Sequence, residues 1–168
     1  LLADNALPAD VQINLSQDFD SGSLDVANST VNGVVVNLVG RNTWTAAGYQ
    51  DRYRWVHFKA SGVEGVSPQF NISAYTFLGS LGGHRFVYSY DQTDWQFFDR
   101  GYTSGNNYVF YNDQAFTSDE VYVAYSLPYP LWRTGQHMAR VAASSYVMPT
   151  ASGSTDLVVG HSAGGVDD

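Results

Sequence analysis

The pattern of apolar and polar residues predicts short β-strands along most of the chain. Nine segments either alternate apolar with polar residues or are rich in Val, Ile, Phe and Tyr: 11–15, 23–28, 34–40, 53–61, 68–75, 84–91, 95–99, 107–112 and 120–127. Runs of Gly, Ser, Asn and Asp separate them, as expected of turns. Strands at this spacing without helices between them favour an antiparallel sandwich or barrel. We predict an all-β fold, an antiparallel β-sandwich of about eight or nine short strands.

The pattern changes after Pro128, where the spacing of apolar residues predicts one short C-terminal helix. Pro130 suits the first helical turn, where its missing N–H costs nothing. Gly135 weakens such a helix by about 1 kcal/mol relative to alanine, so a packing partner is implied. The residues that can share one face are Leu131, Trp132, Met138, Val141 and Ala142.

The same pattern divides the chain into three parts. Residues 1–10 are polar and are interpreted as an N-terminal tail, and residues 11–145 as the sandwich domain with the helix closing one edge. Residues 146–168 are rich in small residues around one apolar run and are interpreted as a linker. We therefore expect the chain to be the front part of a larger protein.

Charge and composition exclude several kinds of partner. The net charge is -8, with Lys59 the one lysine among eight basic residues, so phosphate backbones and anionic lipid should repel the chain. No window approaches the roughly 18 apolar residues that a membrane span needs. Cysteine is absent, which removes disulfides, thiolate metal sites and cysteine nucleophiles and leaves the compartment undecided. Nucleic acid and membrane are thus excluded as main partners, and the oligomeric state stays open.

One motif resembles the nucleophile turn of a serine hydrolase. Gly160, Ser162 and Gly164 form a G-x-S-x-G match after an apolar run. In that mechanism the acid and base follow the serine along the chain, whereas all four histidines precede Ser162 and few residues follow it. A Gly/Ser turn is therefore the favoured interpretation.

Two further groups of residues could suggest a metal. The four histidines, His57, His84, His137 and His161, have no spacing typical of a zinc site, so each is interpreted as a solvated or core-edge side chain. Asp18, Asp20 and Asp25 resemble part of a calcium loop, but the terminal glutamate is missing. A turn in which Asp and Ser bond their own backbone is favoured there.

Aromatic residues leave a binding function open. A row of exposed rings on one sheet face would suit stacking on sugars, so a carbohydrate-binding module of a secreted protein is the alternative function. Trp55 and Trp95 lie within strand patterns, where burial is the default for so large a ring. The candidate rings are Trp44, Tyr49, Tyr53, Trp55, Tyr88, Tyr90, Trp95 and Tyr102.

Several segments in order resemble the N-terminal domain of zinc metallocarboxypeptidases of the cytosolic-carboxypeptidase-like subgroup. "QDFDSGSLDV" is similar to that domain's "FDxGN" turn, and "DRYRWVHFKASG" to its aromatic-rich strand. "HRFVYSYDQTDW" resembles its "YRxVxSYDxxxW" strand and turn, and "VYVAYSLPY" the strand that ends in a Pro-Tyr corner. The motif residues to which we assign structural roles are Phe19, Trp55, Phe58, Arg85, Asp91 and Trp95.

The resemblance implies a non-catalytic β-sandwich that supports folding of an adjacent carboxypeptidase domain and substrate access to it. It implies no catalytic and no metal-binding residue in this chain, because the family's H-P-G-E zinc motif is not reached, and zinc is expected only in that missing C-terminal domain. That peptidase domain of the same protein is the expected partner. The interface with it is expected at Tyr125, Pro128, Tyr129 and Trp132, where the Pro-Tyr corner leaves the sandwich.

Overall fold

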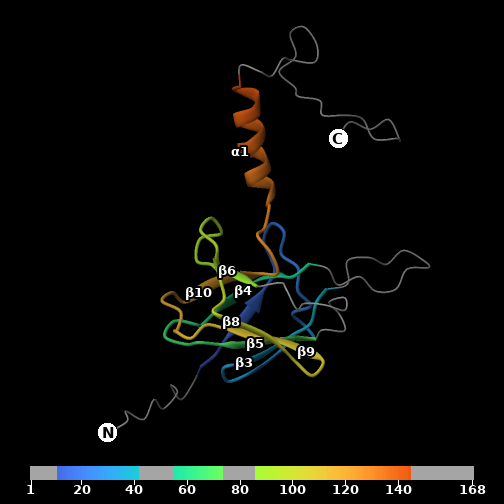
Figure 1. The fold of residues 1–168 in the computed structure, drawn as a ribbon, viewed down its shortest axis with the longest axis vertical. Helices are drawn as coiled ribbons and strands as arrows, with labels where there is room; N and C mark the ends of the chain where they lie inside the picture. Colours follow the sequence, from blue (N-terminus) through green and yellow to red (C-terminus); the bar gives the residue numbers. More distant parts are fainter. Residues whose placement is uncertain (1–10, 42–54, 74–85, 145–168) are drawn as a thin grey trace, which may run out of the picture. The chain divides into compact units, whose positions relative to one another are not determined.

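The computed structural model describes residues 11–41, 55–73 and 86–144. The chain divides into two compact units, Leu1–Pro128 and Tyr129–Asp168. Among the described residues, the ten strands belong to the first unit and the single helix to the second (Figure 1). The all-β class, the sandwich and the one C-terminal helix are confirmed. The predicted boundary at residue 145 lies next to residues that are not described and stays a prediction.

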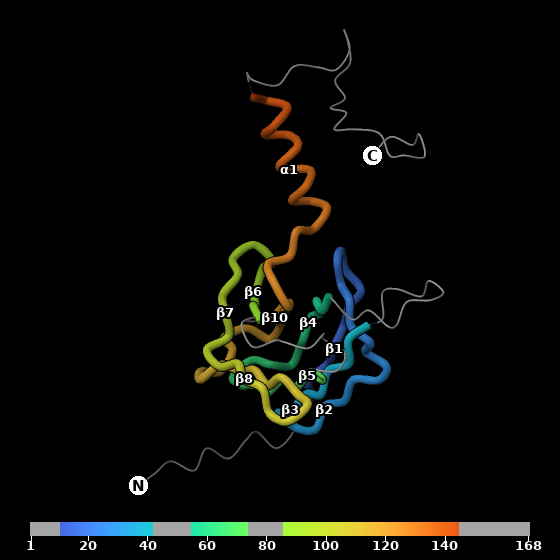
Figure 2. Tube along the Cα trace, turned by 45° about the vertical axis from the view of Figure 1, so that its right-hand side comes forward, coloured from blue at the N-terminus to red at the C-terminus, as the bar shows by residue number. Residues whose placement is uncertain are grey.

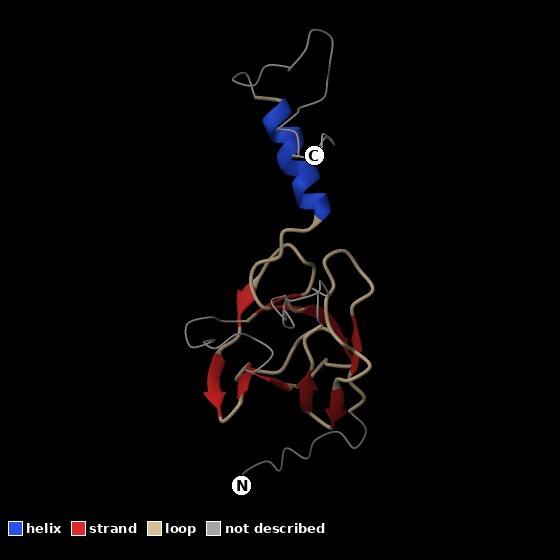
Figure 3. Cartoon of the chain, turned by 90° about the vertical axis from the view of Figure 1, so that its right-hand side faces the viewer, coloured by secondary structure: helices blue, strands red, loops and turns tan. Residues whose placement is uncertain are grey.

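Two five-stranded sheets form the sandwich, and they appear as two layers of arrows in Figure 3. The first sheet has the order β1-β4-β10-β6-β7 and is antiparallel throughout. The second has the order β2-β3-β5-β9-β8 and contains one parallel pair, β3 with β5. The strands of the first sheet are β1 (Asn14–Ser16), β4 (His57–Ser61), β10 (Glu120–Ala124), β6 (Val87–Ser89) and β7 (Gln96–Phe97). Those of the second are β2 (Thr30–Asn32), β3 (Val35–Leu38), β5 (Gln69–Ser73), β9 (Asn107–Tyr111) and β8 (Arg100–Ser104).

Alternation along the strands sends one face of each sheet into the core. On β3 and β5 the buried positions are Val36, Leu38, Phe70 and Ile72, while the residues between them are half-buried. Successive strand side chains point to opposite faces, so this period of two fixes which face is covered. Among the predicted strands, β3, β4, β5, β6, β9 and β10 contain buried positions, whereas β1 and β7 contain none.

Aromatic rings fill much of the space between the sheets. Phe86 and Phe110 stack with their centroids 4.0 Å apart, and Phe70 stacks on Phe110 at 5.3 Å. Phe58 from β4 meets Phe70 edge to face at 5.6 Å, which links the two sheets. Offset and edge-to-face pairs of this kind add about 0.5–1.5 kcal/mol each beyond the area they bury. Phe58, assigned a structural role from its motif, is fully buried here.

Three parts of the sheets differ from the segments predicted by alternation. Residues 23–28 do not form a strand: Ser23 makes a single bridge to His57, and turns follow. The strands β2 and β8 were not predicted. Every residue of β8 is exposed, so its sequence has no apolar face to reveal it, and the pairing with β9 holds it in place.

The hairpin that joins β8 to β9 shows why its turn sequence works. Ser104 pairs with Asn107, which leaves Gly105 and Asn106 as a two-residue loop. Gly105 has φ +58, at the position where a type II′ turn places its glycine. A β-carbon there would be strained, so the glycine fixes the register of an otherwise exposed strand.

The helix α1 (Leu131–Ala142) is the described element of the second unit. Pro130 is its N-cap residue, and the Pro130 carbonyl accepts hydrogen bonds from the backbone N–H groups of Arg133 and Thr134. No side chain caps this end, and the first turn carries no acidic residue. Within the described ranges, no helix is long and apolar enough to cross a membrane.

Candidate functional site

The candidate site lies at one end of the first sheet, around the imidazole of His57. His57 begins β4 and is fully buried. Its ring is surrounded by Phe19 at 4.8 Å, Trp95 at 5.6 Å and Trp55 at 5.9 Å between centroids, all approaching edge to face. We call Phe19, Ser21, Trp55, His57 and Trp95 the His57 cluster. Three of its members come from three different sequence motifs, and the fold brings them together.

Ser21 holds the histidine ring by polar contacts. Ser21 Oγ and His57 Nδ1 lie 2.9 Å apart. Nε2 is buried and has no hydrogen-bond partner in the described part of the chain. Whether Ser21 Oγ or His57 Nδ1 donates this bond depends on the tautomer of the ring. Such buried surroundings favour a neutral imidazole.

Electrostatics point the same way. Burial lowers the pKa of His57 from its ordinary value of 6.5 to about 4, because the charged form cannot be solvated there. A hydrogen bond with the Ser21 backbone and the charge of Asp20 act in the opposite direction and offset part of that shift. His57 is thus uncharged near neutral pH.

Two residues of the site adopt a backbone conformation that side chains rarely accept. Ser21 has φ 64 and Gln92 has φ 62, and both are non-glycine residues. The carbonyl oxygen of Ser21 accepts the Trp55 indole N–H at 2.8 Å, and the carbonyl oxygen of Gln92 accepts that of Trp95 at 3.0 Å. Each tryptophan therefore fixes one strained turn. Strain of this kind costs about 1–3 kcal/mol and persists only where the surroundings hold it.

The loop between β6 and β7 is organised by Asp91, as its place in the "SYDxxxW" motif suggests. Asp91 Oδ1 accepts the backbone N–H groups of Thr93 and Asp94 and the hydroxyl of Ser89, at 2.8, 2.9 and 2.9 Å. A hydrogen bond from the Thr93 side chain, followed by these bonds from the Asp94 and Thr93 backbone and the Ser89 hydroxyl, holds the pKa of Asp91 well below its usual range. The carboxylate thus closes the turn that presents Gln92 and Trp95.

The turn after β1, which ends at the bridge between Ser23 and His57, leaves no room for a side chain at residue 22. A β-carbon on Gly22 would collide with the backbone carbonyl of Gln17, so glycine is required there. Ser23 and His57 exchange both backbone hydrogen bonds, at 2.7 and 3.0 Å. The Ser23 hydroxyl is buried and has no partner among the described residues, like Nε2 of the histidine opposite it. Buried polar groups without partners are uncommon in folded proteins.

The chain leaves the first sheet beside this cluster. Ala124, the last residue of β10, pairs with His57, and the Tyr125 N–H donates to the Val56 carbonyl at 2.9 Å. Figure 2 shows that the turn after β1 and the loop between β6 and β7 lie at the same end of the sandwich as this exit. The motif residues thus gather where the polypeptide continues toward residue 129.

The four predicted interface residues fall into two groups. Tyr125 is half-buried against Phe86 at 5.6 Å, and Pro128 is buried. Tyr129 and Trp132 are 57% and 39% exposed, so both rings are accessible. No finding tests their role, and the interface stays a prediction.

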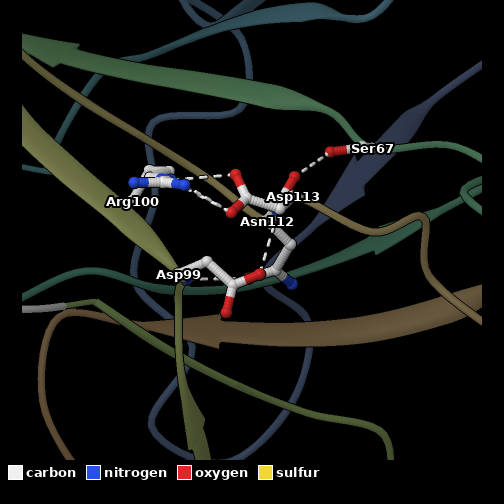
Figure 4. A network of polar contacts seen from close by, with 5 residues as sticks. All are labelled: Ser67, Asp99, Arg100, Asn112 and Asp113. Carbon is white, nitrogen blue, oxygen red and sulfur yellow. Dashed lines mark hydrogen bonds and ion pairs between the residues drawn. The ribbon is translucent and has the colours of Figure 1, made fainter.

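A second polar network stabilises the segment between β7 and β8, where the chain crosses from one sheet to the other (Figure 4). Asn112 Oδ1 accepts the Asp99 N–H at 3.1 Å, and the Asn112 carbonyl accepts the Ser67 hydroxyl. Asp99 Oδ2 accepts the Asp113 N–H at 2.9 Å, and the Arg100 guanidinium binds both Asp113 oxygens. We call these five residues the Asn112 network. It was not predicted, because no local pattern reveals contacts between distant segments.

Chemically, the His57 cluster resembles a structural lock more than a reaction centre. A serine nucleophile needs a basic imidazole oriented by a third group, whereas Nε2 has no such partner among the described residues and the ring pKa is low. Among the described residues, no three potential metal ligands gather. Asp25 accepts from the Asn28 N–H at 3.2 Å, as in the turn that was favoured there. Ser162 and Arg85 lie outside the described residues.

The second sheet bears on the sugar-binding alternative. Its outer face carries a chain of hydrogen bonds from Gln69 to Asn71, from Asn71 to Asn37 and from Asn37 to Thr30, at 3.0, 3.0 and 3.3 Å. A stacking platform would need a row of three or more exposed rings. On β2, β3 and β5 amides and hydroxyls take that place, so nothing here supports the carbohydrate-binding hypothesis.

Comparison with known proteins agrees with the motifs. The family model of the cytosolic carboxypeptidase N-terminal domain matches residues 15–126, two thirds of the chain. The chain belongs to this family. The matched range contains every member of the His57 cluster and of the Asn112 network. No curated protein matches the sequence.

Solved structures share the fold. A metallo-carboxypeptidase from Pseudomonas aeruginosa, in complex with (2-guanidinoethylmercapto)succinic acid, matches with TM-score 0.65 and 25% identity over 92% of this chain and 38% of its own. One from Burkholderia cenocepacia matches with TM-score 0.64 and 20% identity, over 80% of this chain and 34% of its own. A putative carboxypeptidase A from Shewanella denitrificans gives 0.62 and 21%, over 77% and 33%. The chain thus spans little more than a third of these proteins.

Proposed function

We propose that the sandwich is the non-catalytic N-terminal domain of a zinc carboxypeptidase, and that it supports folding of the adjacent peptidase domain and substrate access to it. Family membership and the likeness to metallo-carboxypeptidases support the first part. The observation that carries the second is the position of the His57 cluster, which pairs through His57 with the last residue of β10, where the chain leaves the sheet.

The short stretch of chain after Tyr125 keeps the next domain close to the His57 cluster. Tyr129 comes four positions after Tyr125, and an extended chain covers at most about 3.6 Å per position. Whatever follows residue 129 therefore starts within about 14 Å of Tyr125. A rigid, strained corner at that point suits a surface that orients a neighbouring domain.

In this proposal the zinc and its ligands belong to the peptidase domain. The zinc would polarise the scissile carbonyl and activate a water there. The role of the present residues is to hold surface and chain direction, since Pro128 and Pro130 each fix a backbone angle.

The test uses the longer protein that includes a peptidase domain, together with the 168-residue chain. We expect the longer protein to bind zinc and to release C-terminal amino acids, and removal of residues 1–128 to abolish the soluble, zinc-loaded form. The 168-residue chain should do neither. Zinc-dependent release of C-terminal amino acids by the 168-residue chain, or full activity without residues 1–128, would overturn the proposal.

A matched pair of variants tests the predicted interface. Tyr129 and Tyr102 are exposed to similar degrees, 57% and 48%. Tyr129→Asp in the longer protein should lower kcat/KM or the stability of the peptidase domain, whereas Tyr102→Asp should change neither. Equal effects of the two substitutions would argue against an interface at the exit.

A further inference from the structure

The helix α1 presents two different surfaces. Viewed along its axis, one side gathers Arg133, Gln136, His137 and Arg140, and the opposite side gathers Leu131, Gly135, Met138 and Ala142. No residue of the helix is buried, and Leu131 remains 75% exposed. An amphipathic helix usually buries its apolar side against a neighbour. The described residues do not bury that side.

The polar side, in contrast, has internal contacts. Tyr129 Oη and His137 Nδ1 lie 3.1 Å apart, and the Arg133 guanidinium lies over the Tyr129 ring, 5.9 Å from its centroid. These contacts tie the residue before Pro130 to the first two turns. They orient the basic side of the helix and leave Met138 and Ala142 on the other.

Alone, such a helix would be marginal. It has 12 residues, contains Gly135, and lacks a side-chain cap at its start. Isolated helices shorter than about 12–15 residues are barely stable in water, and a glycine costs about 1 kcal/mol more. A stable α1 therefore needs a surface that covers its apolar side.

The comparisons show that the likeness to a whole metallo-carboxypeptidase extends past the sandwich. The N-terminal-domain family model stops at residue 126. The Pseudomonas aeruginosa structure matches 92% of the 168 residues, about 155, and the first unit has 128, so at least about 27 matched residues lie within 129–168. The second unit thus has a counterpart in that protein beyond the range of the N-terminal-domain family.

We infer that α1 is the first element of the following domain, and that its side with Leu131, Gly135, Met138 and Ala142 docks on the carboxypeptidase domain of the same protein. This inference rests on the proposed function, because it takes the peptidase domain as the occupant. It replaces the expectation that the helix closes an edge of the sandwich.

Hydrogen exchange tests it on two proteins, the 168-residue chain and the longer protein with its peptidase domain. In the shorter chain the amides of α1 should exchange at rates near those of a free peptide, while those of β4 and β10 are protected. In the longer protein α1 should gain ~100-fold protection, as expected of a buried element. Strong protection of α1 in the 168-residue chain would overturn the inference in favour of a sandwich-closing helix, and so would no gain in the longer protein.

Matched substitutions sharpen the result. Met138→Glu, on the apolar side, should reduce the protection of α1 in the longer protein by ~10-fold, because a charge there opposes docking. Gln136→Glu, on the polar side, makes the same charge change and should leave protection unaltered, and equal effects would contradict the inference. Zinc content and peptidase activity are read separately, so a protected helix in a protein without carboxypeptidase activity would refute the proposed function and keep the docking.

Discussion

The His57 cluster and the Asn112 network are two polar corners of one sandwich, and they are built in opposite ways. In the network, the groups named above find partners, and none of its residues has a positive φ. The cluster contains Ser21 with positive φ and a buried Nε2 without a described partner, and Gln92 beside it is the second strained residue. Strain and orphaned polar groups tend to accumulate at functional sites.

These differences indicate that the Asn112 network stabilises the fold, whereas the His57 cluster is a candidate for an interface. The Asn112 network joins Ser67, the link between β7 and β8 and the two residues after β9, and its contacts hold the chain where it changes sheet. In the His57 cluster, strand pairing alone does not account for the two strained turns. The indoles of Trp55 and Trp95 hold these turns beside the point where the chain leaves the sheet.

The largest effect should come from Trp55. Trp55→Ala removes an indole that packs on His57 and donates to the Ser21 carbonyl, so the strained turn loses its clamp. We expect the free energy of unfolding to fall by about 3 kcal/mol, measured by urea denaturation. Trp55→Phe keeps a ring but loses the donor and should cost about 1 kcal/mol. A loss below about 1 kcal/mol for Trp55→Ala would show that the indole does not hold the turn.

The next effect should be a pH dependence that belongs to His57. Its pKa is about 4 in the folded chain and 6.5 ordinarily, so between these values the unfolded state binds more protons. Stability is therefore complete above pH 6.5 and falls as the pH decreases toward 4. Between pH 7.5 and pH 5 the loss should be about 2 kcal/mol.

The control for this pH dependence is His57→Phe, which keeps a ring of similar size but cannot titrate. Its free energy of unfolding should change little between pH 7.5 and pH 5. The exposed His137 remains in this variant, so it also reports any contribution from that histidine. A wild-type slope that persists in His57→Phe would assign the pH dependence to other groups and remove the argument for a neutral buried ring.

In the Asn112 network, the expected effect is smaller and does not depend on the protonation of His57. Asn112→Ala leaves the Asp99 N–H without its acceptor at the sheet crossing and should cost about 1–2 kcal/mol in urea denaturation. Arg100→Ala should cost less, because both members of the Arg100–Asp113 pair are exposed to solvent. If Arg100→Ala proved the more damaging change, the exposed ion pair and not the buried amide would hold the crossing.

How far the sequence could predict this structure depends on how local each signal is. The alternation of apolar and polar residues correctly predicted the buried strands β3, β4, β5, β9 and β10. Successive side chains of a strand point to opposite faces, so a strand with one buried face has an apolar residue at every second position. This alternation could not find β8, whose residues are all exposed, or show that β3 and β5 run parallel. The exposed β8 is held by pairing with β9, its neighbour in the hairpin, and the parallel pair joins two strands that are far apart in the sequence.

The candidate site shows the same limit. The motifs identified Phe19, Trp55, Asp91 and Trp95 one by one, but not that three of them surround His57. The positive φ of Ser21 and Gln92 could not be predicted from the sequence, because glycine is the usual residue at such positions. Here tertiary hydrogen bonds hold two other residues in this conformation. The Asn112 network joins Ser67, Asp99 and Asn112 across the fold, and no spacing in the sequence indicates it.

The smallest effect, and the most direct test of strain, is expected at Gln92. Gln92→Gly should stabilise the chain by about 0.5–1 kcal/mol, because glycine accepts φ 62 without steric cost and the Trp95 indole still bonds to the carbonyl of residue 92. Asn106→Gly is the matched control, a turn residue whose φ is not positive, and it should be neutral or destabilising, since glycine only adds freedom to the unfolded chain. If both substitutions destabilised the chain equally in urea denaturation, position 92 would store no strain, and the contrast between the two corners would reduce to the orphaned groups of Ser23 and His57.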